Sequence, residues 1–227
     1  MIALMPMKGH SERIPMKNIK PLNGRPLFYF IADTLRDTLL FDSLVINTDS
    51  PEIAKLAQSR YGSWVQIFVR PQELCGDHVP MNLILKHDIE LLGLDNHYFQ
   101  THSTSPFLSS QTIVSAVKKY YTLKDEGTFD SIFSVNLLQT RLYDENLVPI
   151  NHDPDRLVRT QDLDLIFEEN SNFYIFSGKS FVLRNNRIGM NPNPFVMNRN
   201  RFESLDIDTK VDWLFAEKIV SMDVFNE

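Results

Sequence analysis

The chain has 227 residues and a formal net charge of −6, with 43% hydrophobic and 23% charged residues. This is the composition of a globular domain with a sizeable core, and the acidic balance argues against nucleic-acid binding. A single cysteine, Cys75, excludes an intramolecular disulfide and favours a reducing compartment. The apolar start has no basic segment before it, and no apolar stretch is long enough to span a membrane. We therefore expect a soluble, cytoplasmic protein without a signal peptide.

Short apolar runs alternate with helical patterns along most of the chain. We expect strands at residues 1–6, 41–48, 64–69, 97–101, 130–136, 172–176 and 202–207. Helices are expected between them, at residues 27–40, 51–61, 79–94, 110–123, 178–183 and 209–220. This alternation predicts an α/β fold with a Rossmann-like, three-layer, mainly parallel sheet.

The alternation breaks down between residues 139 and 169, where charged and turn-forming residues crowd together. An irregular insert of this length in a compact domain is usually either functional or disordered. We therefore interpret residues 1–227 as one domain with an inserted arm at about 139–169. A mobile surface excursion is the alternative.

A basic loop at residues 8–18 follows the first predicted strand and contains Lys8, Arg13 and Lys17. In open α/β sheets, ligands collect where loops leave the carboxyl ends of the strands, so this loop is placed to meet negative charge. Pro15 stiffens it, which a simple linker does not need. The loop is neither a P-loop nor a GxGxxG turn, and a solvated surface loop is the alternative.

Two carboxylates, Asp206 and Asp208, are separated by one apolar residue near the end of the chain. Residues i and i+2 of an extended segment point to the same face, so both carboxylates can converge. Hard oxygen ligands of this kind suit Mg²⁺, which takes one or two carboxylates together with phosphates and water. The alternative is that Asp208 only caps the last helix.

Several segments together resemble one family. Residues 5–27, MPMKGHSERIPMKNIKPLNGRPL, resemble the opening signature of the acylneuraminate (CMP-sialic acid) cytidylyltransferases. Residues 204–212, SLDIDTKVD, resemble the closing stretch of that family. Shorter matches lie between them, at residues 47–50, 70–77, 104–106, 159–163 and 170–174. The resemblance implies a nucleotidyltransferase that joins CTP to an acidic keto-sugar, and a homodimer in which the arm packs against the second subunit.

The resemblance also implies roles for particular residues. Charge neutralisation and catalysis fall to Lys8, Arg13, Lys17 and Asp208. Nucleotide binding falls to Lys8, Ser11, Asn18, Arg70 and Asp77, although Asn18 could instead fix the loop and Arg70 could be purely structural. Sugar binding falls to His102, Thr104, Arg159, Asn170 and Tyr174. The metal, Mg²⁺ or Mn²⁺, falls to Asp206 and Asp208, and no general base can be named.

The chain departs from the family pattern at several places, among them His102 for a glutamine and Ser109 for an arginine. Glu12-Arg13 replaces Lys-Gly, Met81 stands where a serine is usual, and Glu168-Glu169 replaces Arg-Pro. These changes leave open which sugar the protein uses. One alternative is a related enzyme that uses 3-deoxy-manno-octulosonate, legionaminic or pseudaminic acid, or another nucleotide. The other alternative is a relative that binds a nucleotide but has no catalytic activity.

Overall fold

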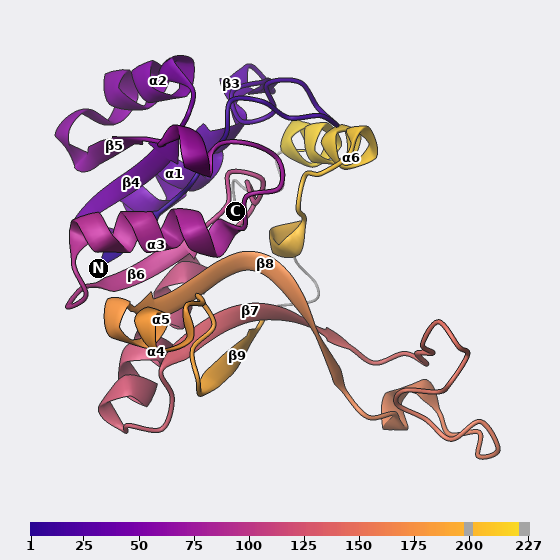
Figure 1. Ribbon diagram of the computed structural model, residues 1–227. Helices are drawn as coiled ribbons and strands as arrows, with labels where there is room; N and C mark the ends of the chain where they lie inside the picture. Colours follow the sequence, from indigo (N-terminus) through magenta and orange to yellow (C-terminus); the bar gives the residue numbers. More distant parts are fainter. Residues whose placement is uncertain (198–201, 223–227) are drawn as a thin grey trace.

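The structure, a computed structural model, describes residues 1–197 and 202–222 and is built around one seven-stranded sheet (Figure 1). Its strands are β1 (Ile2–Leu4), β4 (Ser43–Thr48), β5 (Val65–Val69), β6 (His97–Thr101), β7 (Ser131–Leu138), β8 (Ile166–Ser177) and β9 (Pro192–Val196). They lie in the order β5-β4-β1-β6-β8-β7-β9. β8 is antiparallel to β6 and β7, and all other neighbours are parallel. The predicted mainly parallel sheet is confirmed.

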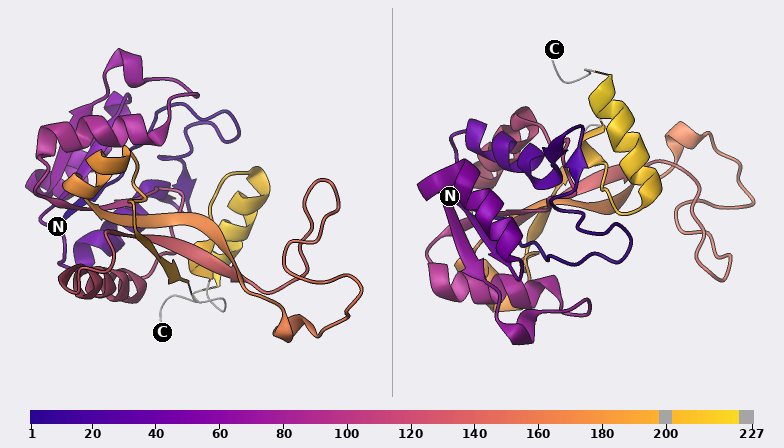
Figure 2. Two further views of the ribbon diagram at one scale, coloured as in Figure 1. Left: turned by 60° about the horizontal axis from the view of Figure 1, so that its bottom comes forward. Right: turned by 90° about the horizontal axis from the view of Figure 1, so that it is seen from above.

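Helices cover both faces of this sheet (Figure 2). One face packs against α1 (Leu27–Asp37), α2 (Pro51–Tyr61) and α4 (Ser110–Asp125). The other packs against α3 (Met81–Leu92) and α5 (Gly178–Arg184). The alternation of a strand explains this division: on β6, Phe99 belongs to the first layer, whereas Tyr98 belongs to the second. The result is the predicted three-layer arrangement.

A third apolar cluster lies under the last helix, α6 (Lys210–Ser221), and joins it to the start of the chain. Trp213 of α6 packs there with Ile14 of the basic loop and with Leu22 of β2 (Pro21–Leu22). β2 pairs with β3 (Arg25–Pro26) in a separate two-stranded ladder. Four short 3₁₀ turns complete the described elements: η1 (Gly62–Trp64), η2 (Gln72–Leu74), η3 (Thr160–Asp162) and η4 (Phe202–Ser204). No described helix has both the length and the apolar character needed to cross a membrane.

The strand predicted at residues 202–207 is wrong. This segment forms η4 followed by irregular backbone, and Ile207 N donates to Thr104 O at 3.0 Å instead of joining a ladder. The sheet edge beside β7 is taken by β9, which the sequence analysis missed. β9 contains Pro192 and Pro194, and proline is tolerated only where a strand lacks a partner on one side.

The segment between β7 and β8, residues 139–165, extends away from the rest of the chain in every view (Figures 1 and 2). It is not featureless, because it contains η3 and a bridge between Tyr143 and Pro149. β8 begins at Ile166, so residues 166–169 of the predicted arm belong to a strand. Large apolar side chains are exposed along the arm, including Leu147 at 79% and Leu157 at 89%.

Candidate active site

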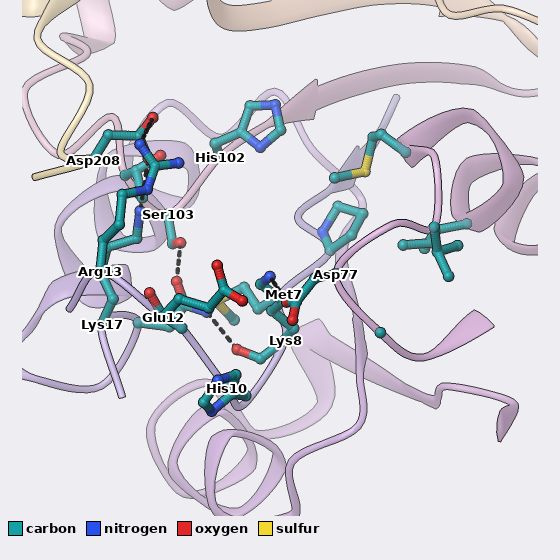
Figure 3. A pocket seen from close by; sticks show the side chains of 18 of the residues that line it. Met7, Lys8, His10, Glu12, Arg13, Lys17, Asp77, His102, Ser103 and Asp208 are labelled. Carbon is teal, nitrogen blue, oxygen red and sulfur yellow. Dashed lines mark hydrogen bonds and ion pairs between the residues drawn. The ribbon is translucent and has the colours of Figure 1, made fainter. Parts of the chain in front are cut away.

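A cavity of about 580 Å³ opens where the chain leaves the carboxyl ends of β1 and β6 (Figure 3). The loop after β1, the segment after β6, the residues before α3 and the segment before α6 all contribute to its wall. All of the predicted site residues line it except Arg159, Asn170 and Tyr174. The lining also includes residues that the sequence did not single out for the site, namely Ser103, Ser171, His78 and Arg187.

The basic loop is held in a fixed path by its neighbours. Gly9 N donates to Asp49 Oδ1 at 2.6 Å, and a Cβ added to Gly9 would lie 2.9 Å from the Cβ of Ser50. Glycine is therefore required there by close approach to the loop after β4. Asn18 fixes the other end, because its Nδ2 donates to Lys8 O at 2.7 Å and its Oδ1 accepts from Ser103. Of the two roles considered for Asn18, its contacts are those of loop fixing.

The basic loop meets the acidic pair directly. Lys17 Nζ lies 3.0 Å from Asp208 Oδ1, and Arg13 Nη1 lies 3.3 Å from Asp208 Oδ2. Lys17 also donates to Ile207 O at 2.8 Å. Ile207 itself is fully buried, while Asp206 and Asp208 on either side of it line the cavity. The predicted convergence of the two carboxylates therefore occurs, although the segment carrying them is not a strand.

Asp206 is the less solvated of the two carboxylates, and its burial raises its pKa. Its Oδ1 is buried without a hydrogen-bond partner among the described residues. An unpartnered buried carboxylate oxygen is costly in water-free surroundings and is normally offset by a cation. No group of three or more His, Cys, Asp or Glu side chains suited to a metal exists in the described part of the chain. Two carboxylates facing a cavity nevertheless fit the oxygen-rich, partly hydrated coordination of Mg²⁺.

The candidates for nucleotide binding at the other side of the cavity differ in the hydrogen bonds and ion pairs that they already make. Lys8 forms an ion pair with Asp77, which lowers the pKa of that carboxyl group. Arg70 is buried and donates through Nε and Nη2 to Asn47 Oδ1 and Asn47 O, both at 2.8 Å. Asn47 Nδ2 in turn donates to the buried Asp88 at 2.6 Å. Arg70 thus makes the carbonyl contacts of a structural arginine while one edge still lines the cavity.

His102, together with Thr104, lines the cavity after β6. Its pKa is lowered to about 3 by burial and then by the nearby Arg187 and Lys17, so the ring is neutral. Gln100 Nε2 and Arg187 Nη1 both approach His102 Nε2, at 3.1 and 3.3 Å. Both are donors, so Nε2 is the acceptor and Nδ1 carries the proton.

Arg187 is the main cavity residue that sequence reasoning missed. It lies between α5 and β9, with Nη1 donating to Gln100 Oε1 at 2.8 Å and Nη2 to Tyr174 Oη at 2.9 Å. No motif marks it. A nearby signal is Gly189, where an added Cβ would lie 2.2 Å from Asp130 Oδ1, so a side chain there would have to displace the Asp130 carboxylate.

Three sugar-binding candidates lie outside the cavity wall of the single chain. Arg159 is on the arm and pairs with Asp162 at 2.7 Å. Asn170 donates to Asn136 Oδ1 at 2.9 Å and shapes the irregularity where β8 pairs with β7. Tyr174 is buried behind the wall and contacts two lining residues, Arg187 at 2.9 Å and Ser171 at 3.0 Å, through its hydroxyl group.

Comparison with known proteins identifies the family. The family model described as cytidylyltransferase matches residues 2–226. The pseudaminic acid cytidylyltransferase of Campylobacter jejuni is 26% identical over 222 residues, covering 95% of this chain and 94% of that protein. The CMP-N,N'-diacetyllegionaminic acid synthase of Legionella pneumophila is 25% identical over 238 residues, covering 97% and 96%. The resemblance drawn from the sequence is confirmed.

Solved structures match in fold. The structure of CMP:2-keto-3-deoxy-manno-octonic acid synthetase complexed with CTP aligns with a TM-score of 0.67 at 10% identity, over 98% of this chain and 99% of the other. The 4-diphosphocytidyl-2C-methyl-D-erythritol synthase from Anaerococcus prevotii gives the same TM-score and identity, over 97% and 96%. At this identity the match concerns the fold alone, and it agrees with the Rossmann-like sheet.

Proposed function

Because the chain belongs to the cytidylyltransferase family, we propose that it transfers a cytidylyl group from CTP to an acidic sugar of the nonulosonic type. The anomeric hydroxyl attacks the α-phosphorus of CTP, the new oxygen–phosphorus bond forms, and the bond to the β-phosphate oxygen breaks. Pyrophosphate leaves, and the hydroxyl proton passes to solvent. The observation that carries this proposal is the meeting of Lys17 and Arg13 with Asp208 inside one cavity.

The side chains of the protein position the triphosphate and neutralise its charge. Lys8, Arg13 and Lys17 line the cavity from one fixed loop, so they can neutralise the triphosphate without rearranging at the moment of reaction. Arginine binds a phosphate through two parallel N–H groups and lysine acts as a point charge, so Arg13 and Lys17 are not equivalent. Ser11 and Asp77 line the same cavity, and we assign them to the nucleotide.

We also propose that Asp206 and Asp208 hold Mg²⁺, or Mn²⁺ in its place. The unpartnered Oδ1 of Asp206 and the exchangeable ion pairs of Asp208 support this assignment. Bound there, the ion would supply Lewis-acid neutralisation of the phosphate oxygens. Lys17 would keep its hydrogen bond to Ile207 O and so hold the acidic segment in place.

A homodimer built through the arm is part of the proposal. The exposed apolar side chains of residues 139–165 have no cover within the described chain, which is unusual for a segment that stands in water. On this view Arg159 and its neighbours act at the cavity of the partner subunit and not at their own. We expect the enzyme in the cytoplasm, in keeping with its single cysteine.

The direct test is a substrate panel. The purified protein is incubated with Mg²⁺, one nucleoside triphosphate and one sugar acid, and pyrophosphate release and the CMP-sugar mass are followed. The acids are pseudaminic, N,N'-diacetyllegionaminic, N-acetylneuraminic and 3-deoxy-manno-octulosonic acid, each with CTP, UTP, ATP and GTP. We expect sugar-dependent release with CTP and one nonulosonic acid. Calorimetric binding of CTP without turnover of any acid would instead identify a non-catalytic relative.

A further inference from the structure

The positive side chains on the described cavity wall are not all paired in the same way. Lys8 is paired with Asp77, and Arg13 and Lys17 are paired with Asp208. Two arginines of the wall remain, and their recorded hydrogen bonds go to neutral groups. Arg70 uses Nε and Nη2 on Asn47, and Arg187 uses Nη1 and Nη2 on Gln100 and Tyr174. Of these five cations, Arg70 and Arg187 are the two whose hydrogen bonds and close ion pairs leave the carboxylates furthest out, with Glu169 at 3.9 Å from Arg187 Nη2.

Arg187 differs from Arg70 in its place. It lines the cavity with Nη1 3.3 Å from His102 Nε2, and its backbone N–H donates to Asn82 Oδ1, in the first turn of α3, at 3.4 Å. Only 16% of its side chain is exposed, and one face of the guanidinium lies on the Tyr174 ring at 3.6 Å from the centroid. Stacking and hydrogen bonds to two strands hold the group at a fixed angle. Such preorganisation keeps the entropic cost of binding a ligand small.

The electrostatics leave Arg187 under-compensated. Burial lowers its pKa, which is the sign of a cation taken out of water. The nearest described carboxylate is that of Glu169. Its Oε1 is 3.9 Å from Arg187 Nη2 and accepts a hydrogen bond from the Tyr174 hydroxyl group. His102 is neutral and adds no negative charge. A guanidinium has five N–H groups, so Arg187 can still donate to a ligand carboxylate in the bidentate geometry that arginine favours.

We propose that Arg187 binds the carboxylate of the acidic sugar and so determines the preference of this enzyme for acids over uncharged sugars. The inference rests on the proposed function. Glu169 acts in the opposite direction, because its negative charge stands beside the arginine and repels an incoming carboxylate. The two side chains together set the affinity for the acid, while binding of CTP depends on the other side of the cavity.

The test compares R187Q, R187K and E169Q with the native chain. The substrates are CTP and the best acid of the panel, used as the free acid and as its methyl ester. R187Q should raise the KM for the free acid by about ten- to a hundredfold, the size of a hydrogen bond to a charged group, with little change in the KM for CTP. R187Q should also lose the native preference for the free acid over the ester. R184Q is the matched control, because Arg184 is exposed and donates to Gly189 O at 2.7 Å, off the cavity wall.

The remaining variants keep the test decisive if R187Q folds poorly, which a thermal melt would reveal. R187K retains the charge and should keep part of the preference for the acid, whereas E169Q should lower the KM for the acid. The inference is overturned if R187Q leaves that KM within twofold of native. It is also overturned if the KM values of acid and ester rise equally, since the residue would then be structural. Failure of the native chain to turn over any acid would instead refute the proposed function, and this inference with it.

Discussion

Lys17 Nζ lies 3.0 Å from Asp208 Oδ1, although 191 positions of sequence separate the two residues. The contact joins the loop after the first strand to the segment before the last helix. Both segments are anchored independently, the first through Asn18 and Ser103 and the second through Ile207 and Thr104. The opposite charges are therefore brought together by the fold and not by their own attraction alone.

The first prediction concerns the acidic pair. Replacement of Asp208 by alanine removes a proposed metal ligand and the partner of Arg13 and Lys17, so we expect kcat to fall at least about a hundredfold. The melting temperature should stay close to native, because the carboxylate faces the cavity. Pyrophosphate release and a thermal melt measure the two quantities. D95A is the control, since Asp95 pairs with Lys179 at an exposed site. Native-like release by D208A would remove the metal assignment.

The second prediction concerns the path of the basic loop. G9A places a methyl group 2.9 Å from the Cβ of Ser50, so the loop must shift and carry Lys8 with it. We expect a stability loss of roughly 1–3 kcal/mol and a fall in kcat/KM of about tenfold or more. The double variant G9A/S50G removes the obstructing Cβ and should recover part of both losses. Equal defects in the single and double variants would show that close packing is not the reason for the glycine.

The third prediction is a pH dependence of stability set by Asp88. This carboxyl group is fully buried in α3, and its Oδ2 has no partner among the described residues. Burial raises its pKa to about 6, against the hydrogen bonds from Asn47 and His87. The folded state therefore binds this proton more tightly than the unfolded chain does. Its stabilising contribution is complete below pH 4 and is lost as the pH rises through about 6.

D88N tests this directly, because the amide keeps an acceptor for Asn47 but cannot ionise. At pH 8 the variant should be more stable than the native chain by roughly 2–3 kcal/mol, and the difference should shrink towards pH 4. Chemical denaturation across this pH range gives the free energies of unfolding. A stability difference that does not vary with pH would rule out titration of Asp88 as its source.

The fourth prediction concerns the arm. Leu147 and Leu157 are 79% and 89% exposed, and we expect a second copy of the chain to cover them. The double variant L147D/L157D should shift the protein from dimer to monomer in analytical ultracentrifugation and should also lower activity. L39D is the control, because Leu39 is 88% exposed on the turn after α1. A native chain that is already monomeric would exclude this role of the arm.

Much of the fold could be predicted because its signals are local. The bounds of α2 and β6 follow directly from a proline start, a glycine stop and a short apolar run, and both agree with the structure. The errors arise where the tertiary context decides. The apolar residues of 202–207 look like a strand, but β9 already occupies that edge. The prolines of β9 argue against a strand in the sequence, and the strand is possible only because it lies at the edge of the sheet.

The candidate site divides in the same way. The spacing of Asp206 and Asp208 led to the prediction that they face one cavity, and both line it, although the strand on which that prediction was based is absent. Arg187 could not be predicted, since its place depends on Gln100 from one strand and Tyr174 from another. The structure of a single chain does not test the role of Arg159, because its proposed site of action belongs to a second subunit.

All seven strands of the sheet end by Val196, whereas Asp206 and Asp208 lie in the segment that precedes α6. During synthesis, the basic loop and every strand of the sheet are therefore made before the two carboxylates. A product truncated after β9 would keep the scaffold and lose the acidic half of the site. The cavity therefore receives its two carboxylates only after the whole sheet has been synthesised.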